Sequence, residues 1–180
     1  MGDVLSYKEE VIRAMELLAQ DERVIFLGQN VLYTGGPTYE TLQSVPDERK
    51  IELPVAEELQ LGMSIGLALE GYIPVSIFPR MDFLMRAMDQ LVNHLDKIEE
   101  MSAGRFRPKV IIRTMIGARY PLNPGAQHSQ DHTTMLYNVL TNIKVVKLVF
   151  LDEIVNAYQE ALESKQSTIL VELAEKIREV

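Results

Sequence analysis

Five short runs of mostly apolar, often β-branched residues alternate along this chain with segments of helical periodicity. The expected strands are residues 23–27, 73–78, 110–114, 143–149 and 168–173. The expected helices are residues 7–20, 55–69, 82–102 and 152–162, with Asp82 as the N-cap of the third. Strands that alternate with helices in this way pack as a mainly parallel sheet covered by helices on both faces. The sequence therefore predicts an α/β fold.

The composition narrows the classes of protein to which the chain can belong. A length of 180 residues without repeats or linkers predicts one domain, residues 1–180. The net charge of −8 argues against nucleic acid or an anionic membrane as a partner. No apolar run is long enough to span a bilayer, and no export signal is visible, so we expect a cytoplasmic protein. The absence of cysteine excludes disulfides and thiolate metal ligands.

Two carboxylates, Glu57 and Glu58, stand at the start of the helix expected at residues 55–69. The rest of that helix is apolar or small, and a charged group near a buried element is costly unless a specific partner meets it. The helix dipole favours an acid in the first turn by about 0.3–1 kcal/mol. A bound ligand would favour it more. The residues alone leave both interpretations open, a simple complement to the helix dipole or a ligand-binding group.

Other candidate residues follow the ends of the expected strands. Ligands of open parallel sheets bind beyond the carboxyl ends of the strands. Residues 28–36, 79–83 and 115–132 lie there in the expected fold, and the helix that begins near Glu57 can face the same edge. The sequence therefore predicts that the candidate residues converge on one side of the sheet.

Three stretches of sequence carry a resemblance to a known family. The first combines the strand at residues 24–28, a Gly-Gly loop and the helix start at 54–57; the others are residues 83–93 and 125–130. In order and spacing they resemble the pyrimidine-binding domain of thiamine-diphosphate enzymes. The chain is similar in this respect to the beta subunit of the 2-oxoacid dehydrogenase first component and to the matching transketolase domain. The similarity covers about residues 7–174.

The resemblance implies catalytic roles for two residues. Glu57 matches the glutamate that hydrogen-bonds a ring nitrogen of the cofactor's aminopyrimidine, which favours the tautomer from which the cofactor carbanion forms. A glutamate suits this role because it can exchange a proton at a partly desolvated helix start. His128 matches the histidine at the substrate end, where it orients a carbonyl or exchanges protons. Glu58 then keeps the simpler role of complementing the helix dipole.

Four further positions are implied to contact the cofactor. Phe83 matches the aromatic residue that lies against the pyrimidine ring, and Val55 and Pro79 match residues that line the same pocket. For these three, ordinary core packing is the alternative. Gln29 stands where relatives usually carry an acid that joins the hydrogen-bonded network near the pyrimidine. Proton transfer near the pyrimidine is therefore expected to differ between this chain and those relatives.

The resemblance also implies a partner. The family binds Mg²⁺ and the diphosphate of thiamine diphosphate through a Gly-Asp-Gly motif in a separate domain, and this sequence contains no such motif. We therefore expect an alpha-type partner subunit that holds the metal and the diphosphate, no metal site in this chain, and assembly into a heterotetramer. We also expect no C-terminal domain of the kind found in the dehydrogenase beta subunits, because the sequence ends at Val180.

The expected activity is decarboxylation or dehydrogenation of a 2-oxoacid, or transfer of a ketol or aldehyde group, on a small carbonyl substrate. One alternative is a non-catalytic subunit that keeps the fold and regulates or stabilises another protein. Another is a flavodoxin-like domain that binds a nucleotide, although the sequence has no phosphate-binding loop.

A few residues are ambiguous. Arg80, Arg113 and Arg119 are expected near the pocket mouth, where they can hold a carboxylate or phosphate; a solvated surface position is the alternative. His128 and His132 have the i, i+4 spacing of metal ligands on a helix, but a third ligand is missing.

The helix at residues 55–69 predicts association of subunits. It is apolar around most of its circumference, which indicates burial on more than one side. Gly62 and Gly66 would let another element approach it closely.

Overall fold

A parallel sheet forms the centre of the molecule. The structure, a computed structural model, describes residues 5–120 and 123–178. It contains a six-stranded sheet in the order β2-β1-β3-β4-β6-β5, in which all neighbouring strands run parallel. The strands are β1 Val24–Gly28, β2 Lys50–Glu52, β3 Ile73–Phe78, β4 Ile111–Ile116, β5 Lys144–Lys147 and β6 Thr168–Leu173. The predicted parallel α/β fold is confirmed. The sequence missed β2, because a strand of three residues carries too little periodicity to be recognised.

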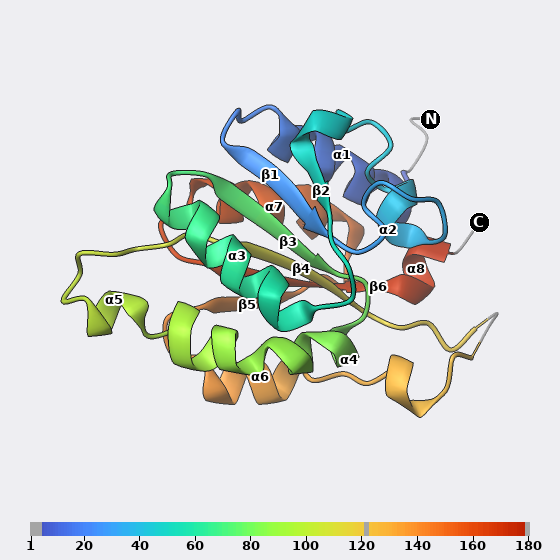
Figure 1. The fold of residues 1–180 in the computed structure, drawn as a ribbon. Helices are drawn as coiled ribbons and strands as arrows, with labels where there is room; N and C mark the ends of the chain where they lie inside the picture. Colours follow the sequence, from blue (N-terminus) through green and yellow to red (C-terminus); the bar gives the residue numbers. More distant parts are fainter. Residues whose placement is uncertain (1–4, 121–122, 179–180) are drawn as a thin grey trace.

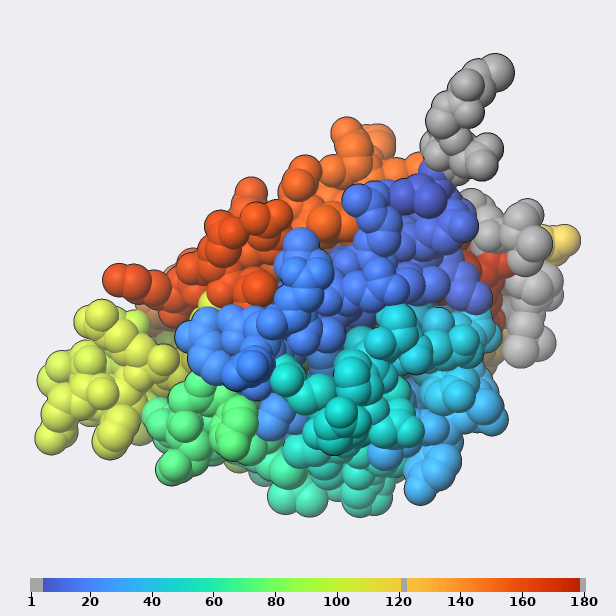
Figure 2. Space-filling view, turned by 90° about the horizontal axis from the view of Figure 1, so that it is seen from above, coloured from blue at the N-terminus to red at the C-terminus, as the bar shows by residue number. Residues whose placement is uncertain are grey.

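Helices cover both faces of the sheet (Figure 1). One face carries α1 Tyr7–Ala19, α7 Ile154–Glu163 and α8 Ala174–Arg178, and the other carries α3 Glu57–Leu69, α4 Met81–Leu84 and α6 Thr133–Val139. Figure 2 looks onto the first face, where α1 and α7 lie side by side. The short helices α2 Pro37–Glu40 and α5 Ile98–Met101 lie at opposite ends of the molecule, α2 beside α8 (Figure 1). None of the helices in the described parts of the chain is long and apolar enough to cross a membrane.

Apolar side chains of the central strands alternate between two cores, one on each face. Val75 and Ile77 belong to the core beneath α1 and α7. Phe78 and Ile112 belong to the core beneath α3 and α6. Burial of one such side chain contributes about 1.5–3 kcal/mol to folding. The two cores together hold β3 and β4 rigidly, and thus fix where these strands end.

The long helix predicted for residues 82–102 is broken, which corrects the sequence analysis. The segment consists of α4, a 3₁₀ turn, a π-helical stretch over Asp89–Leu95 and then α5. The predicted N-cap is also wrong, because Arg80 takes that position and Asp82 lies inside the first turn. In the π-helical stretch, the Asp89 carboxylate accepts a hydrogen bond from Asn93 Nδ2 (2.7 Å), and the Asp89 carbonyl oxygen lies 3.2 Å from His94 Nδ1. Polar side chains of this kind compete with the regular backbone hydrogen bonds of an α-helix.

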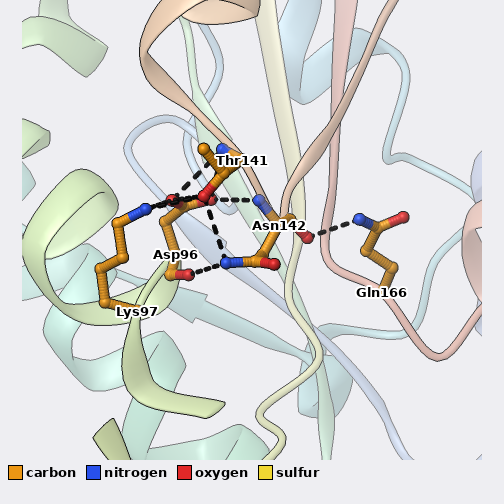
Figure 3. Close-up of polar contacts among 5 residues, drawn as sticks. All are labelled: Asp96, Lys97, Thr141, Asn142 and Gln166. Atoms are coloured by element: carbon orange, nitrogen blue, oxygen red, sulfur yellow. Dashed lines mark hydrogen bonds and ion pairs between the residues drawn. The ribbon is translucent and has the colours of Figure 1, made fainter. Parts of the chain in front are cut away.

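The carboxylate of Asp96 ties the end of this broken helix to the loop before β5 (Figure 3). The side chain is buried and accepts hydrogen bonds from the backbone amides of Thr141 (3.1 Å) and Asn142 (2.7 Å). It also accepts one from the Thr141 hydroxyl (2.9 Å) and pairs with Lys97 Nζ (2.8 Å). Burial raises the pKa of Asp96, but the hydrogen bonds from Lys97, Asn142 and Thr141 outweigh it and hold the pKa below the ordinary value. The carboxylate therefore stabilises the fold in its charged form.

Asp96→Ala is expected to lower the free energy of unfolding by roughly 2–3 kcal/mol, because two buried amides and a hydroxyl lose their acceptor. Urea unfolding at neutral pH measures this, with Asp89→Ala, at an exposed position, as the matched control. Because the folded pKa is lowered, the contribution is complete above the ordinary aspartate pKa and disappears as the pH falls through the folded value. A difference between the native and Asp96→Ala chains that persists unchanged at low pH would contradict this assignment.

Candidate functional site

The candidate site lies where the order of the strands reverses. From β1 the chain passes to β2 on one side and then, through α3, to β3 on the other side. Gly28 ends β1 with φ +153°, and a Cβ atom there would lie 2.3 Å from the carbonyl oxygen of Ile77. The chain can therefore turn away from the sheet at this point only with glycine. The connections that leave β1 and β3 lead to opposite sides of the sheet here, which is the position where open α/β sheets bind ligands.

A pocket of about 260 Å³ opens at this edge. Its walls come from the loop after β1, from the ends of β3 and β4, from the 3₁₀ turn Ala126–His128 and from α8. Four predicted site residues line it, namely Gln29, Pro79, Phe83 and His128. The prediction that these residues converge on one side of the sheet is therefore confirmed by their positions.

Phe83 and His128 contact each other in this pocket. Their ring centroids lie 5.4 Å apart and the rings are nearly perpendicular, at 89°. Edge-to-face contacts of aromatic rings contribute about 0.5–1.5 kcal/mol beyond the area that they bury. Phe83 therefore holds the imidazole of His128 at a defined angle at the edge of the pocket.

Two contacts fix the position of His128, one made by the Asp82 side chain and one by Gly117. Asp82 Oδ1 accepts hydrogen bonds from the backbone amide (3.3 Å) and side chain (2.9 Å) of Gln130, so α4 anchors the segment that carries His128. Gly117 lets that segment pass against the end of β4, since a Cβ atom at this position would lie 1.7 Å from the carbonyl oxygen of His128. Neither Asp82 nor Gly117 was assigned this role from the sequence. The sequence predicts the strand that ends before Gly117, but it does not show that Gly117 lies against the backbone of His128.

Glu52 fixes the loop that carries Gln29. Its carboxylate accepts hydrogen bonds from the backbone amides of Asn30 (2.8 Å), Val31 (2.8 Å) and Leu32 (2.9 Å). Asn30 adopts a left-handed conformation with φ 58°, which asparagine tolerates better than most residues. Glu52 is therefore a positioning residue that the sequence analysis also missed, because its partners lie about twenty residues away.

Glu57 and Val55 lie outside this pocket, around the start of α3. Glu57 is the first residue of α3 and only 3% exposed. Its Oε2 atom lies 3.3 Å from Nε of Arg86, whose side chain is 74% exposed. No hydrogen bond from the described residues reaches the Glu57 carboxylate. Val55 is 77% exposed, so it lines a pocket only when another chain or a ligand covers it.

The three predicted arginines have different positions. Arg80 lines the pocket and is half-buried, as expected. Arg119 is exposed and is not part of the pocket wall. The prediction for Arg113 is wrong, because this residue is fully buried in the core rather than at the pocket mouth. Arg178 of α8 also lines the pocket, and nothing in the sequence pattern singled it out.

Arg113 instead forms a buried ion pair in the middle of the sheet. Its Nε and Nη2 atoms each donate a hydrogen bond of 2.9 Å to the carboxylate of Glu172 on β6. Nη2 also donates to the Thr41 hydroxyl (2.9 Å), and the Tyr158 hydroxyl donates to Glu172 (2.6 Å). The Thr41 hydroxyl in turn donates to the carbonyl oxygen of Pro37, which lines the pocket. The ion pair therefore connects the sheet to one wall of the site.

The histidine spacing considered from the sequence does not produce a metal site. His128 ends a 3₁₀ turn and His132 is the N-cap of α6, so the two do not share a helix face. Within residues 5–120 and 123–178, no group of three or more His, Asp or Glu side chains could hold a metal ion.

Comparison with models of known protein families shows the family to which the chain belongs. Residues 7–178 match the family model described as the transketolase pyrimidine-binding domain. The chain belongs to this family. The predicted resemblance is confirmed over the whole range that it was expected to cover, about residues 7–174, and the flavodoxin-like alternative is set aside.

Curated relatives of this family member include subunits of 2-oxoacid dehydrogenases. The mitochondrial pyruvate dehydrogenase E1 component subunit beta of Ascaris suum is 32% identical over 135 residues, which are 73% of this chain and 36% of that protein. The 3-methyl-2-oxobutanoate dehydrogenase subunit beta of Mycobacterium tuberculosis is 30% identical over 151 residues, which are 79% of this chain and 41% of that protein. The chain thus spans about two-fifths of the length of these relatives.

Two solved transketolase structures share the fold. A split-gene transketolase, described as an inactive beta4 tetramer, superposes with a TM-score of 0.74 at 20% identity, covering 98% of this chain and 54% of its own. Transketolase from Campylobacter jejuni gives a TM-score of 0.70 at 16% identity, over 94% of this chain and 26% of its own. At these identities the likeness concerns the fold alone.

Gly117→Ala is expected to destabilise the pyrimidine-binding domain by more than about 2 kcal/mol, since the new methyl group overlaps the backbone of residue 128. Gly66→Ala is the matched control, because open space surrounds that helical position and alanine favours a helix over glycine by about 1 kcal/mol. Urea unfolding of both variants compares them. Equal stability of the two variants would show that residues 117 and 128 do not make the close contact described.

Proposed function

We propose that this chain is the pyrimidine-binding half of a thiamine-diphosphate active site that a second subunit completes. The assembled enzyme makes or breaks a carbon–carbon bond beside a carbonyl group, either as a 2-oxoacid decarboxylase or dehydrogenase or as a ketol or aldehyde transferase. The family assignment supports this proposal, as do the dehydrogenase beta subunits among the relatives.

The environment of Glu57 carries the proposal. A buried carboxylate is costly unless it is paired and hydrogen-bonded. At Glu57 the charged partner is the guanidinium of Arg86 at 3.3 Å, and this partner is itself 74% exposed and thus remains largely hydrated. A ring nitrogen that shares a proton with this carboxylate would satisfy it better, and Arg86 can move into solvent without disturbing the core. The residues present therefore fit a bound aminopyrimidine.

Each residue then has a specific task. Thiamine diphosphate, when bound, supplies a carbon nucleophile that attacks a carbonyl group and accepts its electrons. Glu57 holds a proton at the pyrimidine nitrogen and moves it during the reaction. Phe83 lies against the pyrimidine ring, and Val55 and Pro79 close the space around it. His128 exchanges protons with the substrate through its imidazole nitrogens, which can donate and accept a proton.

Gln29 stands where the resemblance implies an acid. An amide offers hydrogen bonds but exchanges no proton near neutral pH. Gln29 therefore orients groups next to the pyrimidine and leaves proton transfer to Glu57 and His128.

We assign the diphosphate and Mg²⁺ to the partner. Mg²⁺ prefers an octahedral set of oxygen ligands, which a Gly-Asp-Gly domain supplies in this family. That domain is proposed to belong to an alpha-type subunit, with two copies of each chain in a heterotetramer. The relatives are named as beta subunits, which supports an enzyme that is built from two kinds of subunit.

The outer face of α3 is the proposed docking surface for this partner. Val55 and Leu59 are 77% and 59% exposed, and open space surrounds Gly66. The opposite face of the helix packs on the sheet through buried Leu61 and Ile65. Apolar side chains gathered on an otherwise charged surface are typical of subunit interfaces. This arrangement explains why the helix is apolar around most of its circumference.

Glu57→Gln is expected to slow exchange of the cofactor's thiazolium proton with solvent by at least about a hundredfold, because the amide cannot exchange a proton with the ring nitrogen. The measurement uses the complex with the partner subunit, Mg²⁺ and thiamine diphosphate. Glu58→Gln is the matched control, since this neighbour in the same helical turn is exposed. Unchanged exchange in Glu57→Gln would remove Glu57 from the mechanism.

Leu59→Asp is expected to weaken association with the partner subunit by about a hundredfold, because it places a charge in an apolar contact. Tyr137→Asp, at an exposed apolar position on α6, serves as the control. Co-purification and analytical ultracentrifugation report the assembly. If both variants assemble as the native chain does, α3 is not the docking surface.

A further inference from the structure

A buried amide lies at the junction of the segments that carry the candidate site. Gln60 follows Glu57 by three residues in α3, which packs on β3 (Figure 1), and its side chain is fully buried. Its Nε2 atom donates hydrogen bonds to the carbonyl oxygen of Ile77 (2.9 Å) and to the Ser76 hydroxyl (3.1 Å). The amide therefore ties the helix of Glu57 to the end of the strand that leads to Pro79.

Gly28 allows this amide to approach the end of β1. A Cβ atom at position 28 would lie 3.4 Å from Nε2 of Gln60, besides its overlap with the carbonyl oxygen of Ile77. The amide thus lies where α3, β1 and β3 meet. Each of these elements carries or leads directly to one residue of the proposed site, which are Glu57, Gln29 and Pro79 respectively.

The contacts with β3 determine which way the Gln60 amide faces. A carbonyl oxygen accepts hydrogen bonds but cannot donate one, so Nε2 rather than Oε1 has to face Ile77. Oε1 is buried and has no hydrogen-bond donor among the described residues. A buried acceptor without a donor costs about 1–3 kcal/mol, which an apolar side chain of similar size would avoid. Such an exception calls for a donor that is present in another state of the protein.

Glu57 can supply this donor. Side chains three residues apart in a helix are neighbours, with Cβ atoms about 5–6 Å apart, so the long side chains of Glu57 and Gln60 can meet. A charged carboxylate only accepts hydrogen bonds, whereas a protonated carboxyl group carries one O–H donor. Contact between the Glu57 carboxyl group and Oε1 of Gln60 is therefore repulsive in the charged form and favourable in the protonated form.

We propose that Gln60 is a positioning residue that accepts a hydrogen bond from the protonated carboxyl group of Glu57. Glu57 then holds a proton before the cofactor binds. The inference rests on the proposed function, because this is the proton that Glu57 shares with the pyrimidine nitrogen. On binding, the O–H bond of Glu57 breaks, an N–H bond forms at the ring nitrogen, and the carboxylate keeps the electron pair. No proton from solvent is needed.

The charged groups around Glu57 favour its charged form only weakly. Of the elements that pack on α3, β1 and β3 contain no titratable side chain, the 3₁₀ turn contributes Arg86, and the π-helical stretch contributes Asp89 and His94. Arg86 favours the charged form, but its side chain is 74% exposed and remains hydrated. Asp89, His94 and the neighbouring Glu58 are exposed as well, so solvent and salt screen their effects. The buried amide is therefore opposed by a screened attraction.

Proton uptake during cofactor binding tests the proposal. Isothermal titration calorimetry follows binding of thiamine diphosphate to the complex with its partner subunit, at neutral pH with Mg²⁺, in buffers of different ionisation enthalpy. The dependence of the measured enthalpy on the buffer gives the number of protons taken up for each cofactor bound. Gln60→Met removes the acceptor, and Glu57→Gln gives the background from all other groups. Gln90→Met is the matched control, because this half-buried glutamine also packs against α3, at Gly62.

We expect the native complex and Gln90→Met to take up no proton beyond the Glu57→Gln background, because Glu57 is already protonated. Gln60→Met is expected to take up more, up to about one proton per site, because the charged form of Glu57 is no longer disfavoured. A native complex that takes up about one proton above the background would overturn the proposal, whether or not Gln60→Met folds. Equal uptake by the native complex and Gln60→Met would also overturn it, since Gln60 would then only support the packing of α3.

Exchange of the thiazolium proton separates this result from the proposed function. Normal, Glu57-dependent exchange together with full proton uptake by the native complex would contradict only the role of Gln60. A native complex that binds no thiamine diphosphate, or a Glu57→Gln complex that exchanges the thiazolium proton as fast as the native one, would contradict the proposed function and the inference with it.

Discussion

The ion pair between Arg113 and Glu172 is the interaction on which the arrangement of the site depends. Both side chains are fully buried, and the pair joins β4 to β6 in the centre of the sheet. Removing one partner from such a pair leaves an uncompensated buried charge and typically costs about 3–5 kcal/mol. Tyr158 and Thr41 add hydrogen bonds to the pair, so α7 and the segment before β2 are held to the same point, and Nη1 of Arg113 has no partner among the described residues. Burial, together with the charge of Glu172, holds the pKa of Tyr158 well above its ordinary value, so its hydroxyl remains a donor. The walls of the pocket are thus fixed from inside the core.

Around this fixed centre, the two proposed halves of the site have different physical characters. The pocket at the ends of β1, β3 and β4 is polar and carries the positive charges of Arg80 and Arg178. The start of α3 combines the buried carboxylate of Glu57 with an exposed apolar surface. In the proposed function the pyrimidine contacts both, Phe83 and Pro79 from the pocket and Glu57 from the start of α3, and another subunit covers the exposed apolar surface.

The sequence predicts most of the fold because the strong periodic signals are local. Strand β3 and strand β6 were placed at their observed bounds, and Gln29, Pro79, Phe83 and His128 were expected to converge as they do. The failures involve interactions between distant segments. Arg113 lies in an expected strand and Arg119 in the segment after it, but the pattern does not show that Arg113 finds its partners, Glu172 and Thr41, inside the core. Likewise, Arg178 reaches the pocket only because α8 packs beside α2.

The distance between the Glu57 carboxylate and the pyrimidine nitrogen is the most direct test of the account. A crystal structure of this chain with its partner subunit, Mg²⁺ and thiamine diphosphate would measure it. The account predicts a separation within hydrogen-bonding range, about 2.6–3.2 Å, with the Arg86 guanidinium displaced from the carboxylate. A bound cofactor whose pyrimidine lies away from Glu57, with the pair between Glu57 and Arg86 intact, would contradict it.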